Sequence, residues 1–214
     1  MAPPDGQEAA ASARPVHRAD ATTNDVAAYA NGQPSRNHHI WLVTGPAGCG
    51  KTTVAEYLAE ALGMPYVEGD AYHTPDNVER MRNGHPLTDT DRWEWLIGLR
   101  HESMRRIAAG ADGVVVTCSA LKRKYRDVIR VASYWNRNVL IHFIFLNATA
   151  DVLLRRVTAR RDHYMGPDMV QSQFDILERP AEDECDVISI DVDHSIEEVQ
   201  ADALARVTDM IGRH

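Results

Sequence analysis

The segment from Gly45 to Thr52, with the sequence Gly-Pro-Ala-Gly-Cys-Gly-Lys-Thr, most constrains what this chain can fold into. It follows a short apolar run at residues 40–44, which predicts a buried strand. It precedes residues 53–62, whose apolar positions recur with a helical period. The segment meets every position of the pattern G-x-x-x-x-G-K-[ST] in the strand–loop–helix context that the pattern requires. The sequence therefore predicts a phosphate-binding loop for a nucleoside triphosphate.

Each residue type in this loop has a physical task. Glycines let the backbone curl so that successive N–H groups point inward at phosphate oxygens, and the following helix adds the positive end of its dipole. We expect Lys51 to reach the β- and γ-phosphates, Thr52 to offer its hydroxyl to Mg²⁺, and Thr53 to contact the α-phosphate. The predicted nucleotide-binding residues of the loop are Gly45, Ala47, Gly48, Cys49, Gly50, Lys51, Thr52 and Thr53.

Strands and helices are predicted to alternate along the rest of the chain. Further strands are expected at residues 64–67, 113–118, 139–146 and 187–192. Further helices are expected at residues 75–83, 91–109, 149–161 and 196–211. This alternation predicts βαβ units and an α/β fold with one parallel sheet covered on both faces.

The domain organisation follows from a change in composition near residue 37. The first 36 residues are rich in Ala, Pro, Asp and small polar residues without apolar periodicity, so residues 1–36 are expected to be a disordered tail. Residues 37–214 are expected to form a single domain.

Composition and charge exclude several classes of partner. The formal net charge of −8 disfavours nucleic acid and anionic membranes, and no apolar run approaches the ~20 residues that cross a bilayer. Cys49, Cys118 and Cys185 are widely spaced and odd in number, which predicts a reducing cytoplasmic location. Two basic clusters, at residues 122–130 and 155–161, would suit an anionic substrate.

Other segments narrow the class of phosphate-loop protein. A GTPase would carry an Asn-Lys-x-Asp guanine motif, which the sequence lacks. A large ATPase would end a strand in an Asp, whereas the third predicted strand ends in Thr117-Cys118-Ser119. The short helix after the second strand and the arginines near residue 160 are typical of small-molecule kinases, in which a flap covers the acceptor and an arginine lid covers ATP.

Three blocks of residues resemble the gluconokinase family of phosphate-loop kinases. The first block is Gly69-Asp-Ala-Tyr-His73, Asn77, Met81, Gly84, Pro86-Leu87, Asp89, Asp91-Arg92 and Trp95-Leu96. The second is Cys118-Ser-Ala-Leu-Lys122 with Tyr125, Arg126 and Arg130, and the third is Arg156, Arg160, His163, Met169, Ser172-Gln-Phe174, Leu177-Glu178 and Pro180. Arg80 stands where the family usually has Lys. The resemblance covers roughly residues 40–211. Shikimate kinases share the fold, but the Asp-x-Asp of their second strand is absent.

The resemblance implies a three-layer kinase fold with a central parallel five-stranded sheet, an acceptor flap and an arginine lid. It implies transfer of the γ-phosphoryl group of ATP to the 6-hydroxyl of D-gluconate, with ATP and Mg²⁺ as cofactors and gluconate as the small-molecule partner. Family members are often dimers, so a homodimer is an open expectation.

Five side chains are candidates for the acceptor site. Asp70 follows the second strand at the edge where a parallel sheet opens its ligand crevice, so we expect it to act as a base or to orient the hydroxyl, with a water-mediated contact to Mg²⁺. Its alternative role is to cap the next segment. His73 could bind a sugar hydroxyl or the carboxylate, or be an ordinary loop histidine. Arg92 suits a carboxylate because guanidinium offers two parallel hydrogen bonds, although an ion pair with Asp89 or Glu94, or a solvated helix face, is the alternative. Ser119 and Lys122 follow the third strand on the same edge, and Lys122 could hold the carboxylate or the transferred phosphate, or be a solvated helix lysine.

Arg156 and Arg160 are expected to form the lid. They stand four residues apart and so share one helix face. In that position they would neutralise the charge that develops on the transferring phosphoryl group, unless they are simply a solvated basic face. The expected catalytic residues are Lys51, Asp70 and Arg160.

Five other residues are weaker candidates. Asp89 and Asp91 could bind polyol hydroxyls, although helix initiation explains Asp91 nearly as well. Arg126 and Arg130 continue the helix that follows Lys122, and His163 lies near the expected lid.

Three other functions stay open at this point. One is a kinase for another small acceptor, such as a different sugar acid or shikimate. A nucleoside monophosphate kinase fits less well, because the segment at residues 70–91 is rich in carboxylates and histidine rather than in arginines for a second phosphate. The third is a non-catalytic nucleotide-binding module, which the presence of Lys51, Thr52, Asp70 and Arg160 disfavours.

Overall fold

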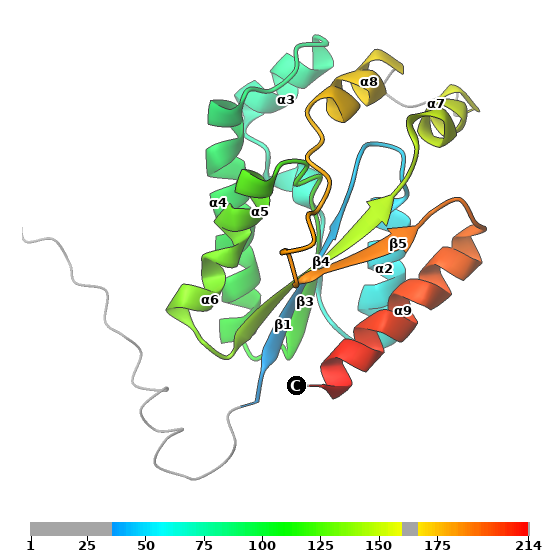
Figure 1. The fold of residues 1–214 in the computed structure, drawn as a ribbon. Helices are drawn as coiled ribbons and strands as arrows, with labels where there is room; N and C mark the ends of the chain where they lie inside the picture. Colours follow the sequence, from blue (N-terminus) through cyan, green and yellow to red (C-terminus); the bar gives the residue numbers. More distant parts are fainter. Residues whose placement is uncertain (1–35, 160–166, 214) are drawn as a thin grey trace, which may run out of the picture. The chain divides into compact units, whose positions relative to one another are not determined.

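A computed structural model describes residues 36–159 and 167–213. Within them, five parallel strands form one sheet in the order β2-β3-β1-β4-β5 (Figure 1). The strands are β1 (His38–Thr44), β2 (Tyr66–Val67), β3 (Gly113–Thr117), β4 (Val139–Asn147) and β5 (Val187–Asp191). The predicted parallel five-stranded sheet is confirmed. The predicted tail lies outside the described residues, apart from Arg36.

Helices cover both faces of the sheet. They are α2 (Lys51–Leu62), α3 (Pro75–Arg82), α4 (Asp89–Ala108), α5 (Arg123–Arg130), α6 (Ala132–Trp135), α7 (Ala150–Ala159), α8 (Pro167–Asp175) and α9 (Ile196–Gly212), with a short 3-10 turn, η1 (Gly69–Tyr72). Figure 1 shows α2 and α9 on one face and α4, α5 and α6 on the other. It also shows α3, α7 and α8 beyond the carboxyl ends of the strands, where a ligand crevice is expected.

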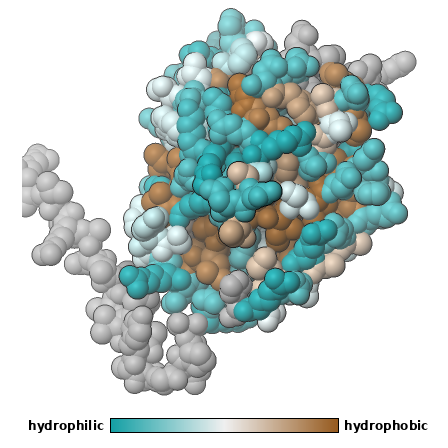
Figure 2. Space-filling model, viewed as in Figure 1, coloured by the Kyte–Doolittle hydropathy of each residue, from teal (hydrophilic) through white to brown (hydrophobic). Residues whose placement is uncertain are grey.

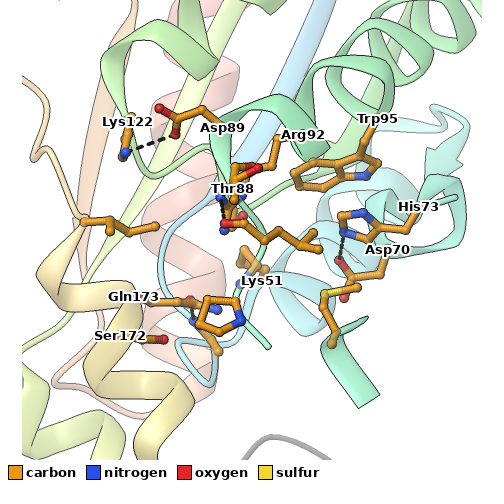
Figure 3. Close-up of a pocket in the computed structure, with 16 residues that line it drawn as sticks. Lys51, Asp70, His73, Thr88, Asp89, Arg92, Trp95, Lys122, Ser172 and Gln173 are labelled. Carbon is orange, nitrogen blue, oxygen red and sulfur yellow. Dashed lines mark hydrogen bonds and ion pairs between the residues drawn. The ribbon is translucent and has the colours of Figure 1, made fainter. Parts of the chain in front are cut away.

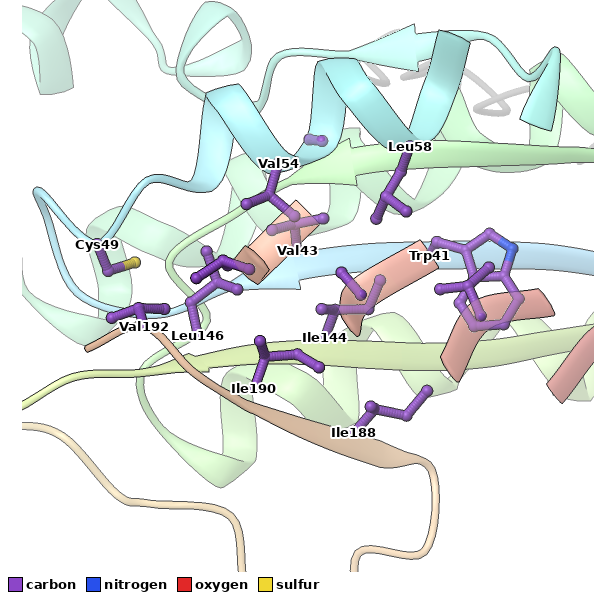
Figure 4. Close-up of a cluster of buried hydrophobic side chains, with 14 of the residues drawn as sticks. Trp41, Val43, Cys49, Val54, Leu58, Ile144, Leu146, Ile188, Ile190 and Val192 are labelled. Atoms are coloured by element: carbon purple, nitrogen blue, oxygen red, sulfur yellow. The ribbon is translucent and has the colours of Figure 1, made fainter. Parts of the chain in front are cut away.

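Two apolar cores lie on opposite faces of the sheet because the central strands are buried on both sides. On the face of α2 and α9, Trp41 and Val43 of β1 pack in one cluster with Leu58 of α2 (Figure 4). On the other face, Ile40 and Leu42 of the same strand belong to a second cluster with residues of α4 and α5. Successive side chains of β1 thus point to opposite faces of the sheet, so the strand is packed between two helical layers.

Helix α4 begins two residues earlier than predicted. The helix begins at Asp89 rather than Asp91, because Thr88 and Asp91 form a capping box. The Asp91 carboxylate accepts hydrogen bonds from the backbone N–H and the hydroxyl of Thr88, both at 2.7 Å. These bonds hold the pKa of Asp91 below its usual range. Helix initiation is therefore what Asp91 does here.

Hydrophilic residues cover most of the face seen in Figure 2, and apolar areas lie between them. Among the residues whose exposure is described, Tyr134 and Trp135 of α6 are the most exposed large apolar side chains, at 84% and 54% of their surface. No helix within residues 36–159 and 167–213 combines the length and the apolar character needed to span a bilayer.

Candidate active site

A cavity of about 340 Å³ lies where the phosphate loop, the turn after β2, and helices α4 and α8 meet (Figure 3). All five predicted acceptor residues line it together with Lys51. Its lining includes Ala47, Lys51, Asp70, His73, Asp89, Arg92, Trp95, Ser119, Lys122 and Gln173. The five predicted acceptor residues and Lys51 therefore lie around one cavity, although Lys51 and Lys122 are 71 positions apart in the sequence.

The phosphate loop has the backbone that its glycines predict. Gly45 has a φ of 139°, and an added Cβ would lie 2.9 Å from the carbonyl oxygen of Leu146, so a side chain there would meet both strain and a clash. The Gly45 N–H donates to the Ser119 carbonyl at 3.3 Å, which ties the loop to the end of β3. Lys51 Nζ donates to the carbonyl oxygens of Gly45 and Pro46 at 3.1 and 3.0 Å. The lysine thus lies along the inside of its own loop.

Cys49, Thr52 and Thr53 of the phosphate loop lie in different environments. Cys49 is buried at 2% exposure, and burial raises the pKa of its thiol, so it contributes packing and its backbone N–H rather than a reactive sulfur. Thr53 is exposed, and its carbonyl oxygen accepts from Gln200 Nε2 of α9 at 3.3 Å. Thr52 points its hydroxyl at a carboxylate that the sequence analysis missed.

That carboxylate is Glu68, at the end of β2. Its oxygens accept hydrogen bonds from Thr52 Oγ1 at 3.2 Å, from Thr117 Oγ1 at 2.6 Å and from the Tyr66 hydroxyl. Burial raises the pKa of Glu68, but the hydrogen bonds from Thr117 and Tyr66 outweigh it and lower the pKa overall. Its signal in the sequence was an acid two residues before Asp70, which a search for Asp-x-Asp alone passes over.

Gly69 lets the turn after β2 lie directly against β3. Its N–H donates to Thr117 Oγ1 at 2.9 Å, and its carbonyl oxygen accepts from Trp95 Nε1 at 2.7 Å. A Cβ on Gly69 would lie 1.9 Å from the Thr117 carbonyl oxygen, which is impossible without moving backbone. This close approach positions Asp70, whose side chain is 62% exposed, on the wall of the cavity.

His73 is fixed between Trp95 and Asp70. Its ring stacks on Trp95 with centroids 4.1 Å apart, and its Nε2 lies 3.9 Å from Asp70 Oδ1. The side chain is only 5% exposed, and its Nδ1 has no hydrogen-bond partner among the residues described. Burial lowers the pKa of His73, so the ring is neutral near pH 7. A buried neutral ring with one unpartnered nitrogen is suited to a polar ligand group.

Within the described residues, the charge of Lys122 is neutralised by a neighbouring carboxylate, whereas that of Arg92 is not. Lys122 Nζ donates to Asp89 at 3.0 Å, and Asp89 also binds Lys124 and the Tyr125 hydroxyl. The hydrogen bond from Lys124, then those from Tyr125 and Lys122, hold the pKa of Asp89 far below its usual range. Asp89 is therefore an anchor for the basic cluster at residues 122–130 and not an open polyol ligand.

Arg92 has no carboxylate partner in the part of the chain described. Its Nη1 donates to the carbonyl oxygen of Thr88 at 3.2 Å, to that of Leu87, and to the Tyr125 hydroxyl at 3.4 Å. The alternative of an ion pair with Asp89 or Glu94 is therefore wrong. Three neutral acceptors orient the guanidinium and leave its charge unpaired.

Arg126 and Arg130 form ion pairs that hold parts of the domain together. This corrects their listing among the weaker candidates for the site. Arg126 is 1% exposed and donates through Nε and Nη2 to Glu184 at 2.7 and 2.6 Å. Arg130 donates to Glu184 at 2.7 Å and to Asp186 at 2.7 Å. Both arginines thus join α5 to the segment that precedes β5.

The lid residues are described only in part. Arg156 Nη2 donates to the Val192 carbonyl oxygen at 2.7 Å, which places the arginine beside the loop after β5. Arg160 and His163 lie outside the described residues. No group of three His, Cys, Asp or Glu side chains within residues 36–159 and 167–213 could hold a metal ion by itself.

Relatives in sequence and a solved structure indicate the family of this chain. A family model described as an AAA domain matches residues 40–180. The chain is 45% identical to a probable gluconokinase of Schizosaccharomyces pombe over 177 residues, covering 82% of this chain and 91% of that one. It is 35% identical to the thermoresistant gluconokinase of Escherichia coli over 170 residues, covering 79% and 94%. Among solved structures, a gluconokinase from Sinorhizobium meliloti 1021 matches with a TM-score of 0.72 and 37% identity, covering 83% and 96%. The chain belongs to the gluconokinase family of phosphate-loop kinases.

Proposed function

We propose that this protein transfers the γ-phosphoryl group of ATP to the 6-hydroxyl of D-gluconate and releases ADP and 6-phospho-D-gluconate. In that step the bond between the γ-phosphorus and the β–γ bridging oxygen breaks, a bond to the 6-oxygen forms, and the hydroxyl proton leaves. The single observation that carries the proposal is the shared cavity, in which Lys51 of the phosphate loop faces Asp70 and Arg92 of the acceptor side. Family membership supports the same reaction.

Arg92 is the proposed partner of the gluconate carboxylate. Its Nη1 is held by neutral oxygens, and its Nε and Nη2 have no partner among the described residues. An unpaired guanidinium with two adjacent donors matches a carboxylate in a bidentate arrangement. Lys122 is a weaker partner because Asp89 already neutralises it. We assign Lys122 and Ser119 to hydrogen bonds with substrate hydroxyls.

Asp70 is the proposed group that receives or orients the 6-hydroxyl. It lies on the cavity wall beside the loop lysine, and its carboxylate is close enough to His73 for the two to act on neighbouring substrate oxygens. Positioning of this kind is the main contribution that a protein makes to phosphoryl transfer. His73 would donate or accept one hydrogen bond to the substrate through Nδ1.

ATP and Mg²⁺ fit the residues present. The N–H groups of the loop and Lys51 suit the phosphates, and Arg156 and Arg160 are the proposed lid arginines. Because no cluster of side chains in the described part of the chain is complete enough to bind a metal alone, Mg²⁺ would be held by Thr52 and phosphate oxygens, with Glu68 or Asp70 acting through water. When bound, Mg²⁺ would neutralise phosphate charge during transfer.

A coupled assay of ADP release tests the reaction. We expect turnover with gluconate and at least a hundredfold less with shikimate, a nucleoside monophosphate or a neutral hexose. Asp70→Asn should remove the gluconate turnover, whereas Asp209→Asn, which alters an exposed pair at the far end of α9, should not. Turnover on a different acceptor would keep the phosphate loop and reject the substrate. A cytoplasmic location and a homodimer stay predictions.

A further inference from the structure

One side chain of α8 reaches the phosphate loop. Gln173 Oε1 accepts a hydrogen bond from the backbone N–H of Ala47 at 2.7 Å. In Figure 3, Gln173 extends from α8 toward the loop that carries Lys51. The contact joins segments 126 residues apart and puts a neutral amide among the donors that form the phosphate site.

This contact fixes which way the amide points. The Ala47 N–H can only donate, so the group that faces it must be the carbonyl oxygen of the side chain. The Nε2 group, with its two N–H donors, is therefore on the other branch of the amide. Nothing among the described residues is bonded to that Nε2, although Gln173 is partly buried and lines the same cavity as Lys51 and Asp70.

The position lies between the two substrates of the proposed reaction. Ala47 and Lys51 belong to the loop that binds the phosphates, and Asp70 and Arg92 belong to the acceptor side. A donor at this junction gains most when negative charge spreads over the oxygens of the transferring phosphoryl group and onto the leaving oxygen, because the donor is already oriented and needs no reorganisation. An amide also adds no charge that would compete with Lys51 for the phosphate.

We propose that Gln173 is a further catalytic residue, anchored by Oε1 to the Ala47 N–H and donating through Nε2 to the phosphoryl group as it is transferred. The proposal deepens the proposed function and rests on it for the identity of the acceptor. The binding of the γ-phosphate by Nε2 can be tested without any acceptor.

Two substitutions distinguish the role of the Gln173 side-chain oxygen from that of its NH₂ group. Gln173→Glu keeps an oxygen for the Ala47 N–H but puts a negatively charged oxygen where the NH₂ group was. Gln173→Met keeps the length of the side chain and removes both hydrogen bonds. The matched control is Gln171→Glu, on the same helix, where the exposed side chain bonds only to Asp175 among the described residues.

The first measurement compares ADP with a non-hydrolysable ATP analogue by titration calorimetry. Gln173→Glu should weaken the ATP analogue about tenfold or more and change ADP less than threefold, since ADP has no γ-phosphate. A purely structural role would weaken both nucleotides alike or lower the melting temperature. Equal losses for ADP and the analogue would overturn the proposal whatever the acceptor is.

The second measurement is turnover with gluconate. Removing one preorganised donor typically costs about 10²–10³ in kcat, so we expect kcat to fall by about that factor in Gln173→Met and further in Gln173→Glu, with KM for gluconate within threefold. Unchanged kcat with tighter analogue binding in Gln173→Met would show that the amide oxygen competes with phosphate, which would refute the donor role. A wild type inactive on gluconate would instead reject the proposed function and leave the nucleotide comparison standing.

Discussion

The buried ion pair between Arg126 and Glu184 should be a large single contribution to the stability of the domain. Each side chain is 1% exposed, and the guanidinium binds both carboxylate oxygens. Arg126 Nη1 also donates to the carbonyl oxygens of Ala120 and Glu178 at 3.2 and 3.1 Å. Glu184→Gln keeps the shape but faces the guanidinium with an NH₂ group and leaves a buried cation without a counter-charge.

The expected loss can be estimated in two ways. Breaking a buried pair by removing one partner typically costs about 3–5 kcal/mol. The hydrogen bonds from Arg126 lower the pKa of Glu184 from 4.5 to about 2, and a displacement of that size corresponds to about 3 kcal/mol. Both estimates are a large share of the roughly 5–15 kcal/mol that stabilises a typical domain.

Urea unfolding at pH 7, followed by circular dichroism, measures the loss. Arg126→Met should cost less than Glu184→Gln, because Arg130 Nη2 still binds Glu184 at 2.7 Å. The double variant should lose much less than the sum of the two single losses, and Asp209→Asn, at an exposed pair, should lose under about 0.5 kcal/mol. A Glu184→Gln loss below about 1 kcal/mol would refute the argument.

The ion pair between Arg126 and Glu184 also predicts how the stability of the domain changes at acidic pH. The folded pKa of Glu184 lies below its unfolded value of about 4.5, so its stabilisation is complete above that pH and is lost as the pH falls toward 2. The difference in unfolding free energy between the wild type and Glu184→Gln should therefore shrink between pH 5 and pH 3. A constant difference across that range would contradict the assigned pKa.

Three further predictions concern the acceptor side. Gly69→Ala should destabilise the fold by about 3 kcal/mol, the upper end for overpacking, because its Cβ would lie 1.9 Å from the Thr117 carbonyl oxygen, and urea unfolding measures it. Burial lowers the folded pKa of His73 below the unfolded value of 6.5, so stability should fall as the pH drops below 6.5, and less so in His73→Gln, as melting temperatures between pH 7.5 and 5.5 would record. Arg92→Lys should raise KM for gluconate about tenfold, or ~1.4 kcal/mol, and more than Lys122→Met does; the reverse order would move the carboxylate to Lys122.

The strongest patterns in the sequence predicted most of the fold. The apolar runs at β1, β3 and β4 are buried on both faces, so their composition alone predicted strands there. The short strand β2 was predicted two residues too long, because Met64 and Pro65 continue the apolar run without joining the ladder. Helices α6 and α8 were not predicted, since four residues and a polar nine-residue segment carry little periodicity.

The sequence could place candidate residues that directly follow a strand. It could not predict which side chains those residues, or residues on helices, would contact. Asp70 and Lys122 were found because the carboxyl ends of parallel strands meet at one edge. The sequence made Arg126 a weaker candidate than Arg92, but it could not show which partners either arginine would meet. Only the fold decides that Arg126 meets a buried carboxylate and that Arg92 meets three neutral oxygens.

That difference explains how an acidic protein can bind two anionic substrates. The chain carries a formal net charge of −8, yet its cavity is lined by Lys51, Arg92 and Lys122 against the carboxylates of Asp70 and Asp89. Asp89 cancels Lys122, and carbonyl oxygens rather than acids orient Lys51 and Arg92. Neutral acceptors fix a cation without consuming its charge. In the proposed reaction, the two unpaired cations are those that would each meet an anion, the phosphate of one substrate and the carboxylate of the other.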